Sequence, residues 1–206
     1  MAIDGKYKTI KASSEGIYKE KGSKFYAYAY PCKEEEKAKE LIAVLRKQNP
    51  QAVHVCFAWR FGVSQFRDRF SDDGEPNNSA GKPIFGQIVS KDVTNVLLAV
   101  VRYYGGTKLG VGGLIQAYKA AVEDALSGAE IVKKQLTASY LLAFRPELIG
   151  QMMQLITQQS AIIMEQGFEN NLSTLKFKVP VSGEERLLNA LQQYPGVEHK
   201  LIRREQ

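Results

Sequence analysis

The chain has 206 residues, of which 44% are hydrophobic and 10% aromatic, so it can form one large or two small domains with apolar cores, and intrinsic disorder is excluded. Its two cysteines form neither a disulfide framework nor a metal-binding cluster, which predicts a reduced, cytoplasmic protein. The first eleven residues hold no apolar segment and no later run reaches the roughly 18 apolar residues of a membrane span, so we expect no secretory signal and no membrane partner.

The formal net charge of +6 is distributed unevenly along the chain. Residues 1–136 hold 21 Lys and Arg against 15 Asp and Glu, whereas residues 137–206 hold seven of each. If the protein binds a polyanion such as RNA, we therefore expect the first part of the chain to make the contacts.

The N-terminal segment alternates between apolar and polar residues and predicts strands. Residues 7–14 form the first, and a turn near Gly16 leads to a second that is interrupted at residues 21–23 and resumes at 24–30. Three tyrosines share one face of the last segment, namely Tyr26, Tyr28 and Tyr30. Such a face could stack nucleic-acid bases, although sheet packing under a helix is the more frequent role.

A helix is predicted from about residue 34 to residue 48, because apolar residues recur at helical spacing until Asn49-Pro50. Residues 53–63 then form a strand on which His54 and Cys56 share a face. The pair resembles half of a metal site, but the only other histidine is His199, so the alternative is a structural role.

An acidic segment follows, with carboxylates at Asp72, Asp73 and Glu75. These side chains could hold Mg²⁺, or they could accept backbone N–H bonds and shape a turn around Gly74-Pro76. We expect Ser79 to act as the N-cap of the next helix.

Residues 94–103 form a nearly unbroken apolar run, which predicts a central strand. A loop with five glycines in residues 105–113 follows and opens a helix near Gly112 that buries Leu114 and Tyr118. The unpaired N–H groups at the start of that helix, together with Lys108, suit a phosphate; the alternative is a tight connection that binds nothing. The spacing fits neither a P-loop nor a dinucleotide fingerprint. The candidate anion-binding residues are Lys82, Arg102, Tyr103, Tyr104, Gly105, Gly106, Lys108, Gly110, Gly112 and Gly113.

The order of the predicted elements after residue 136 is βαββαβ, the ferredoxin-like pattern. Ser182 and Glu185 are expected to form a capping box for its second helix. We therefore predict an α+β protein with a domain boundary at residue 135, giving domains 1–135 and 136–206.

Three segments resemble the signature of the YigZ/IMPACT family: FSDDGEP, SAGKPI and VVRYYGGTKLGVGGLIQAY, in the family's order and spacing. The resemblance implies an N-terminal α/β sandwich similar to domain IV of elongation factor G and a ferredoxin-like C-terminal domain similar to its domain V. It also implies a place in translation, because the eukaryotic relatives are translation regulators.

Three functions remain open from the sequence. The first is a protein that binds RNA or the ribosome through phosphate contacts of the glycine loop. The second is a Mg²⁺-dependent enzyme acting on phosphate groups, against which stands the lack of a nucleophile paired with a base. The third is a module that docks a protein partner. Apart from the possible Mg²⁺, no cofactor is expected, and the sequence does not specify the oligomeric state.

Overall fold

A computed structural model describes residues 5–205 of the chain. The first eleven residues, which we expect to hold no secretory signal, therefore lie partly outside the described range. The protein is an α+β fold, as predicted, and its strands form three antiparallel sheets. It divides into two compact units, one of residues 8–133 and one that combines residues up to 7 with those from 134 onward. The division into domains 1–135 and 136–206 stays a prediction. None of the helices in the described range is long and apolar enough to cross a membrane.

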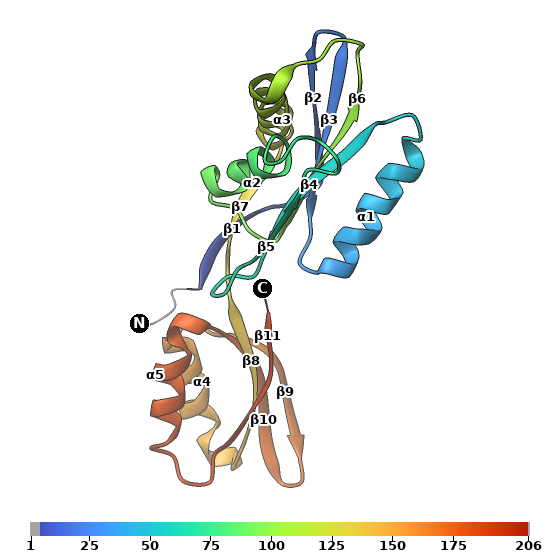
Figure 1. Cartoon of the computed structure of the whole chain (residues 1–206). Helices are drawn as coiled ribbons and strands as arrows, with labels where there is room; N and C mark the ends of the chain where they lie inside the picture. Colours follow the sequence, from blue (N-terminus) through green and yellow to red (C-terminus); the bar gives the residue numbers. More distant parts are fainter. Residues whose placement is uncertain (1–4, 206) are drawn as a thin grey trace. The chain divides into compact units, whose positions relative to one another are not determined.

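The first unit is built on a five-stranded sheet in the order β2-β3-β6-β4-β5, with antiparallel neighbours throughout (Figure 1). The strands are β2 (Ser14–Glu20), β3 (Ser23–Pro31), β4 (His54–Phe61), β5 (Arg67–Ser71) and β6 (Val96–Tyr103). Helix α1 (Glu35–Gln48) packs on one face of this sheet, whereas α2 (Gly81–Ser90) and α3 (Gly110–Ser127) pack on the other.

Strand β6 is the central strand, as its apolar sequence predicted. Every residue from Val96 to Arg102 is buried, because helices cover both faces of the sheet at this position. Alternate residues of β6 therefore belong to two different apolar clusters, one under α1 and one under α2 and α3. The strand ends at Tyr103, two residues before the glycine-rich loop begins at Gly105.

Strand β2 lies against the C-terminal part of α3, and Gly16 is the point of closest approach. A Cβ atom at Gly16 would come within 2.3 Å of the backbone nitrogen of Ala125. The hydroxyl of Ser14 donates to the carbonyl oxygen of Ala125 at 2.7 Å, and the N–H of Ile17 donates to Asp124 Oδ2 at 2.8 Å. The predicted turn near Gly16 is therefore wrong: the glycine lies inside the strand because it lets two backbones meet.

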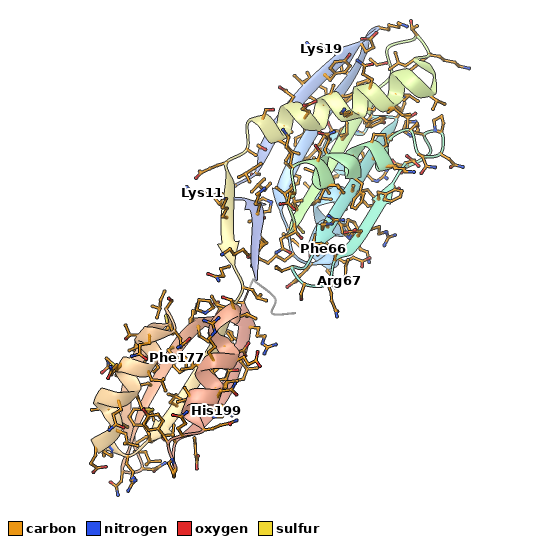
Figure 2. The ribbon with its side chains drawn as sticks, turned by 90° about the vertical axis from the view of Figure 1, so that its left-hand side faces the viewer. Lys11, Lys19, Phe66, Arg67, Phe177 and His199 are labelled. Carbon is orange, nitrogen blue, oxygen red and sulfur yellow. The ribbon has the colours of Figure 1, made fainter. Side chains whose placement is uncertain are left out.

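A separate two-stranded sheet joins β1 (Lys6–Ile10) to β7 (Ile131–Gln135), and the division between the units falls within both strands. The two ends of the five-stranded sheet are marked by Lys19, next to the β2–β3 turn, and by Phe66, before β5 (Figure 2).

The second unit has the predicted order βαββαβ. Its elements are β8 (Thr137–Phe144), η1 (Pro146–Leu148), α4 (Ile149–Gln158), β9 (Ile162–Glu169), β10 (Leu172–Pro180), α5 (Val181–Leu191) and β11 (Glu198–Glu205). The sheet order is β11-β8-β10-β9, and α4 and α5 bury their apolar faces against it. The capping box is wrong, since α5 already begins at Val181 and no side chain caps it, which places Ser182 and Glu185 inside the helix.

We expect Gly16→Ala to lower the free energy of unfolding by about 1–3 kcal/mol, because the new methyl group overlaps the backbone of α3. Gly86→Ala is the matched control: Gly86 lies inside α2, and a methyl group there would meet no described protein atom within 4 Å outside the adjoining helix backbone, so alanine should stabilise by about 0.5–1 kcal/mol. Urea unfolding measures both changes. Equal stability of the Gly16 variant and the parent protein would contradict the close contact.

Candidate anion-binding loop

The glycine-rich loop leaves the central strand and enters α3 at one end of the first unit (Figure 1). Tyr104 to Lys108 are all exposed, and so are Gly110 to Gly112. The helix begins at Gly110, two residues before the predicted start, and no side chain caps its N-terminus. Its first N–H groups therefore face solvent together with the positive end of the helix dipole.

The glycines of the loop serve two different purposes. Gly105 packs on the turn between β2 and β3, where a Cβ atom would lie 2.0 Å from the carbonyl carbon of Gly22; its N–H donates to the hydroxyl of Ser23 at 3.1 Å. Gly106 and Gly110 adopt positive φ angles of 87° and 71°, which side chains disfavour. Apart from the adjoining backbone, no described protein atom lies within 4 Å of a Cβ position at these two residues, so the backbone is open to solvent.

The remaining glycines lie in the first turn of α3. Gly112 is exposed and has no protein atom near its Cβ position, whereas Gly113 is half-buried, and a Cβ atom there would lie 3.0 Å from the Cβ atom of Leu109. Over the described residues 5–205, the backbone N–H groups from Gly106 to Gly112 donate no hydrogen bond to another protein group. Lys108 is exposed, and in the same range its ammonium group makes no ion pair. The loop thus presents unsatisfied donors and one cation on one exposed surface.

Arg102, expected to bind phosphate, is not available for it. Its guanidinium is buried, and Nη1 lies 2.5 Å from Glu75 Oε1, whose side chain is also buried. The hydroxyl of Tyr118 donates to the same carboxylate oxygen at 2.7 Å. Arg102 therefore neutralises a buried carboxylate and joins the acidic turn to β6 and α3. No sequence motif indicated that Glu75 is the partner of Arg102. The one available signal was Tyr118, because a tyrosine on a buried helix face usually needs a hydrogen-bond partner for its hydroxyl.

Asp72 caps the N-terminus of α2, although it lies nine residues before Gly81 in the sequence. Its Oδ1 accepts the N–H groups of Ala80 and Gly81, at 2.9 and 2.8 Å, and its Oδ2 accepts that of Asn78 at 2.8 Å. The predicted cap at Ser79 is wrong, because its hydroxyl donates instead to the carbonyl oxygen of Pro76 at 2.6 Å. An ionised carboxylate is the stronger acceptor and is favoured by the helix dipole.

The other aspartate of the turn, Asp73, is also engaged by the protein. Its Oδ2 accepts the N–H of Val55 at 2.7 Å, and its Oδ1 accepts a hydrogen bond from Arg46 Nη2 at 2.5 Å. Among residues 5–205, no three His, Cys, Asp or Glu side chains come together as a metal-binding group would require. The contacts of Asp72, Asp73 and Glu75 match the turn-shaping alternative.

His54 and Cys56 take structural positions beside the same turn. His54 Nδ1 lies 2.6 Å from the carbonyl oxygen of Asp73, and Cys56 Sγ lies 3.1 Å from that of Asp72. Burial raises the pKa of the Cys56 thiol, so the side chain stays protonated and unreactive.

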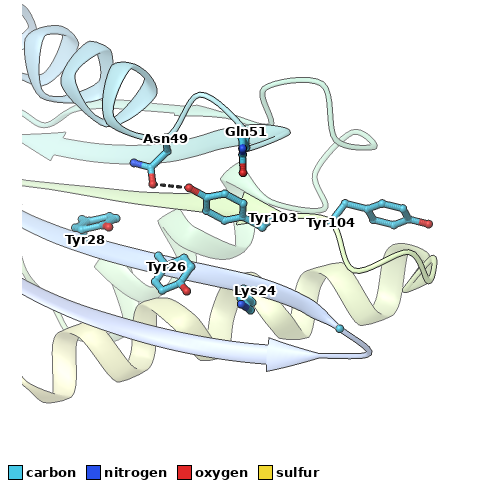
Figure 3. A pocket seen from close by; sticks show the side chains of 8 residues that line it. Lys24, Tyr26, Tyr28, Asn49, Gln51, Tyr103 and Tyr104 are labelled. Carbon is cyan, nitrogen blue, oxygen red and sulfur yellow. Dashed lines mark hydrogen bonds between the residues drawn. The ribbon is translucent and has the colours of Figure 1, made fainter.

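A groove of about 560 Å³ opens beside the loop, on the face of the sheet that carries α1 (Figure 3). We call it the tyrosine groove; its lining residues are Gly22, Lys24, Tyr26, Tyr28, Asn49, Gln51, Tyr103 and Tyr104. The hydroxyl of Tyr103 donates to Asn49 Oδ1 at 2.7 Å, whereas Tyr104 is half exposed at the mouth. The last candidate, Lys82, is exposed in the first turn of α2. Lys24, Asn49 and Gln51 were not predicted as site residues, because they come from separate elements.

Comparisons with known proteins agree on one family. The family description "Impact N-terminal domain" matches residues 21–126. "IMPACT family member YigZ" from Escherichia coli is 40% identical over 109 residues, which are 52% of this chain and 53% of that protein. An "IMPACT family member" from Haemophilus influenzae is 33% identical over 154 residues, which are 74% of this chain and 75% of that protein. The aligned part spans between 53% and 60% of the length of YigZ and two further curated relatives. A crystal structure described as that of a hypothetical protein is 27% identical with a TM-score of 0.68, over 97% of this chain and 98% of the other.

Glu75→Gln should lower the free energy of unfolding by about 3 kcal/mol, because the guanidinium of Arg102 would remain buried without a counter-charge. Glu40→Gln, which breaks the exposed pair with Lys37, should change it by no more than about 0.5 kcal/mol. Urea denaturation of both variants gives the comparison. If the two substitutions lower the free energy of unfolding by the same amount, the buried pair does not stabilise the acidic turn as described.

Proposed function

Because the chain belongs to the IMPACT family, we propose that it is a cytoplasmic RNA- or ribosome-binding protein that acts in translation and contacts phosphate through its glycine-rich loop. The observation that carries the proposal is the row of backbone N–H groups from Gly106 to Gly112, which are unpaired within residues 5–205 and belong to exposed residues except at the half-buried Leu109. Backbone amides at a helix N-terminus bind phosphate oxygens without reading a base.

Charge supports the same assignment. Lys108 adds an exposed ammonium group to the loop, and the whole positive excess of the chain lies in residues 1–136. Lys82 would extend the positive surface from the neighbouring helix α2, while Arg102 acts only by fixing the end of β6. Contacts of this kind give binding that is led by shape and weakened by salt.

The fold supports a place near RNA by resemblance. We propose that the first unit is an α/β sandwich similar to domain IV of elongation factor G and that the second is ferredoxin-like, similar to domain V. The element order βαββαβ and the sheet order β11-β8-β10-β9 agree with the second assignment.

A Mg²⁺-dependent reaction has less support. Asp72, Asp73 and Glu75 would supply its carboxylates, yet all three accept hydrogen bonds from the protein's own groups. Redirecting them to a cation would uncap α2 and release Arg102. Phosphate binding at the loop needs no such rearrangement.

Lys108→Ala should weaken binding to a short single-stranded RNA and reduce the slope of log K against log[salt] by about one, because one phosphate contact and its released counterion are lost. Lys119→Ala is the matched control, since Lys119 is exposed on the same helix and makes no ion pair within the described chain. Fluorescence anisotropy over a salt series measures affinity and slope together.

Equal slopes for the parent protein and both variants would contradict the role of the loop. The same conclusion would follow if Lys119→Ala reduced the slope as much as Lys108→Ala, because the effect would then reflect net charge alone.

A further inference from the structure

The tyrosine groove has the composition of a surface that holds flat rings. Tyr26 and Tyr103 meet edge to face, with ring centroids 5.9 Å apart at 86°, and both are half-buried. Tyr28 continues the row along β3 and stacks on Tyr30, at 6.2 Å and 3°. The rings are thus held by neighbours on one side while they still line an open groove.

Polar and cationic groups surround these rings. Lys24 lines the groove, and Lys19 lies directly across from it on β2, so both project from the same face. Neither makes an ion pair in the described range of residues. Gln51 adds amide donors and acceptors on the side of β4. On β2, the residue of this face that lies opposite Tyr28 is the acidic Glu15.

The groove and the loop share a wall. Tyr104 lines the groove and directly precedes Gly105 in the chain. Gly22 lines it from the other side, and a Cβ atom on Gly22 would lie 2.8 Å from the carbonyl oxygen of Gly105, so the two backbones touch there. A ligand that crosses Tyr104 would pass from the phosphate-binding amides to the tyrosine rings without leaving the surface.

From this juxtaposition we propose that the tyrosine groove is a stacking subsite for an unpaired base of single-stranded RNA, next to a phosphate held by the loop. The inference rests on the proposed function and adds the class of RNA. The volume of about 560 Å³ lies within the roughly 300–1,000 Å³ typical of ligand pockets. Tyrosine rings stack bases of any sequence, whereas paired bases in a duplex are not available to them.

The test compares two probes with the same phosphates: a short oligouridylate and an abasic ribose-phosphate chain of equal length. The parent protein should bind oligouridylate roughly tenfold more tightly, since one stacked base contributes about that factor. Tyr104→Ala should remove most of this difference, because Tyr104 is 49% exposed at the mouth of the groove and its loss leaves the core intact. Tyr104→Phe should keep the difference, because it keeps the ring.

Phe66→Ala is the matched control: Phe66 is an aromatic residue with 54% exposure at the other end of the sheet, and its removal should leave both affinities unchanged (Figure 2). Photocrosslinking with 5-iodouracil should attach the RNA to Tyr26, Tyr103 or Tyr104.

Equal affinity for the two probes, with the salt slope still dependent on Lys108, would overturn the stacking subsite and leave the proposed phosphate site standing. Absence of binding to either probe would overturn both. Tighter binding to duplex RNA than to oligouridylate would also overturn the subsite.

Discussion

The buried ion pair between Arg102 and Glu75 is the interaction on which the rest of the first unit depends. It joins three segments that are far apart in the sequence: the acidic turn, the end of the central strand β6 and, through the hydroxyl of Tyr118, the helix α3. Removing either charge would leave the other in a low-dielectric interior, so the two side chains hold each other in place. The glycine-rich loop starts three residues after Arg102, and its origin is therefore fixed by this pair.

This arrangement separates the charges that build the unit from the charges that face solvent. Arg102, Glu75, Asp72 and Asp73 have partners within the protein, whereas Lys24 and Lys108 have none among the described residues. The unpaired lysines lie beside the exposed amides and the tyrosine rings, at the end of the sheet where Gly22 meets Gly105. Because Gly22 and Gly105 have no side chains, their backbones can pack closely, and this contact brings together a loop and a groove from different parts of the chain.

Regular elements with one apolar face were predictable because their patterns are local. The central strand, the buried face of α3 and the order of elements in the second unit followed from periodicity alone. The cap at Ser79 was wrong because a local motif does not reveal that Asp72, eight residues before Ala80, supplies the stronger acceptor. The capping box at Ser182 was wrong because α5 already begins at Val181. Arg102 was assigned to phosphate because its partner lies 27 residues away along the chain.

The sequence by itself determined the α+β class, the family signature, the positive charge of the first part and the presence of a glycine-rich connection between a strand and a helix. Only the tertiary structure decided which of the charged groups near that connection are engaged in the fold and which face solvent. It also assembled the tyrosine groove, whose residues come from β3, the end of α1 and the end of β6. The physical reason is that burial and pairing are properties of neighbours in space, and spacing along a chain specifies those neighbours only within a single strand or helix.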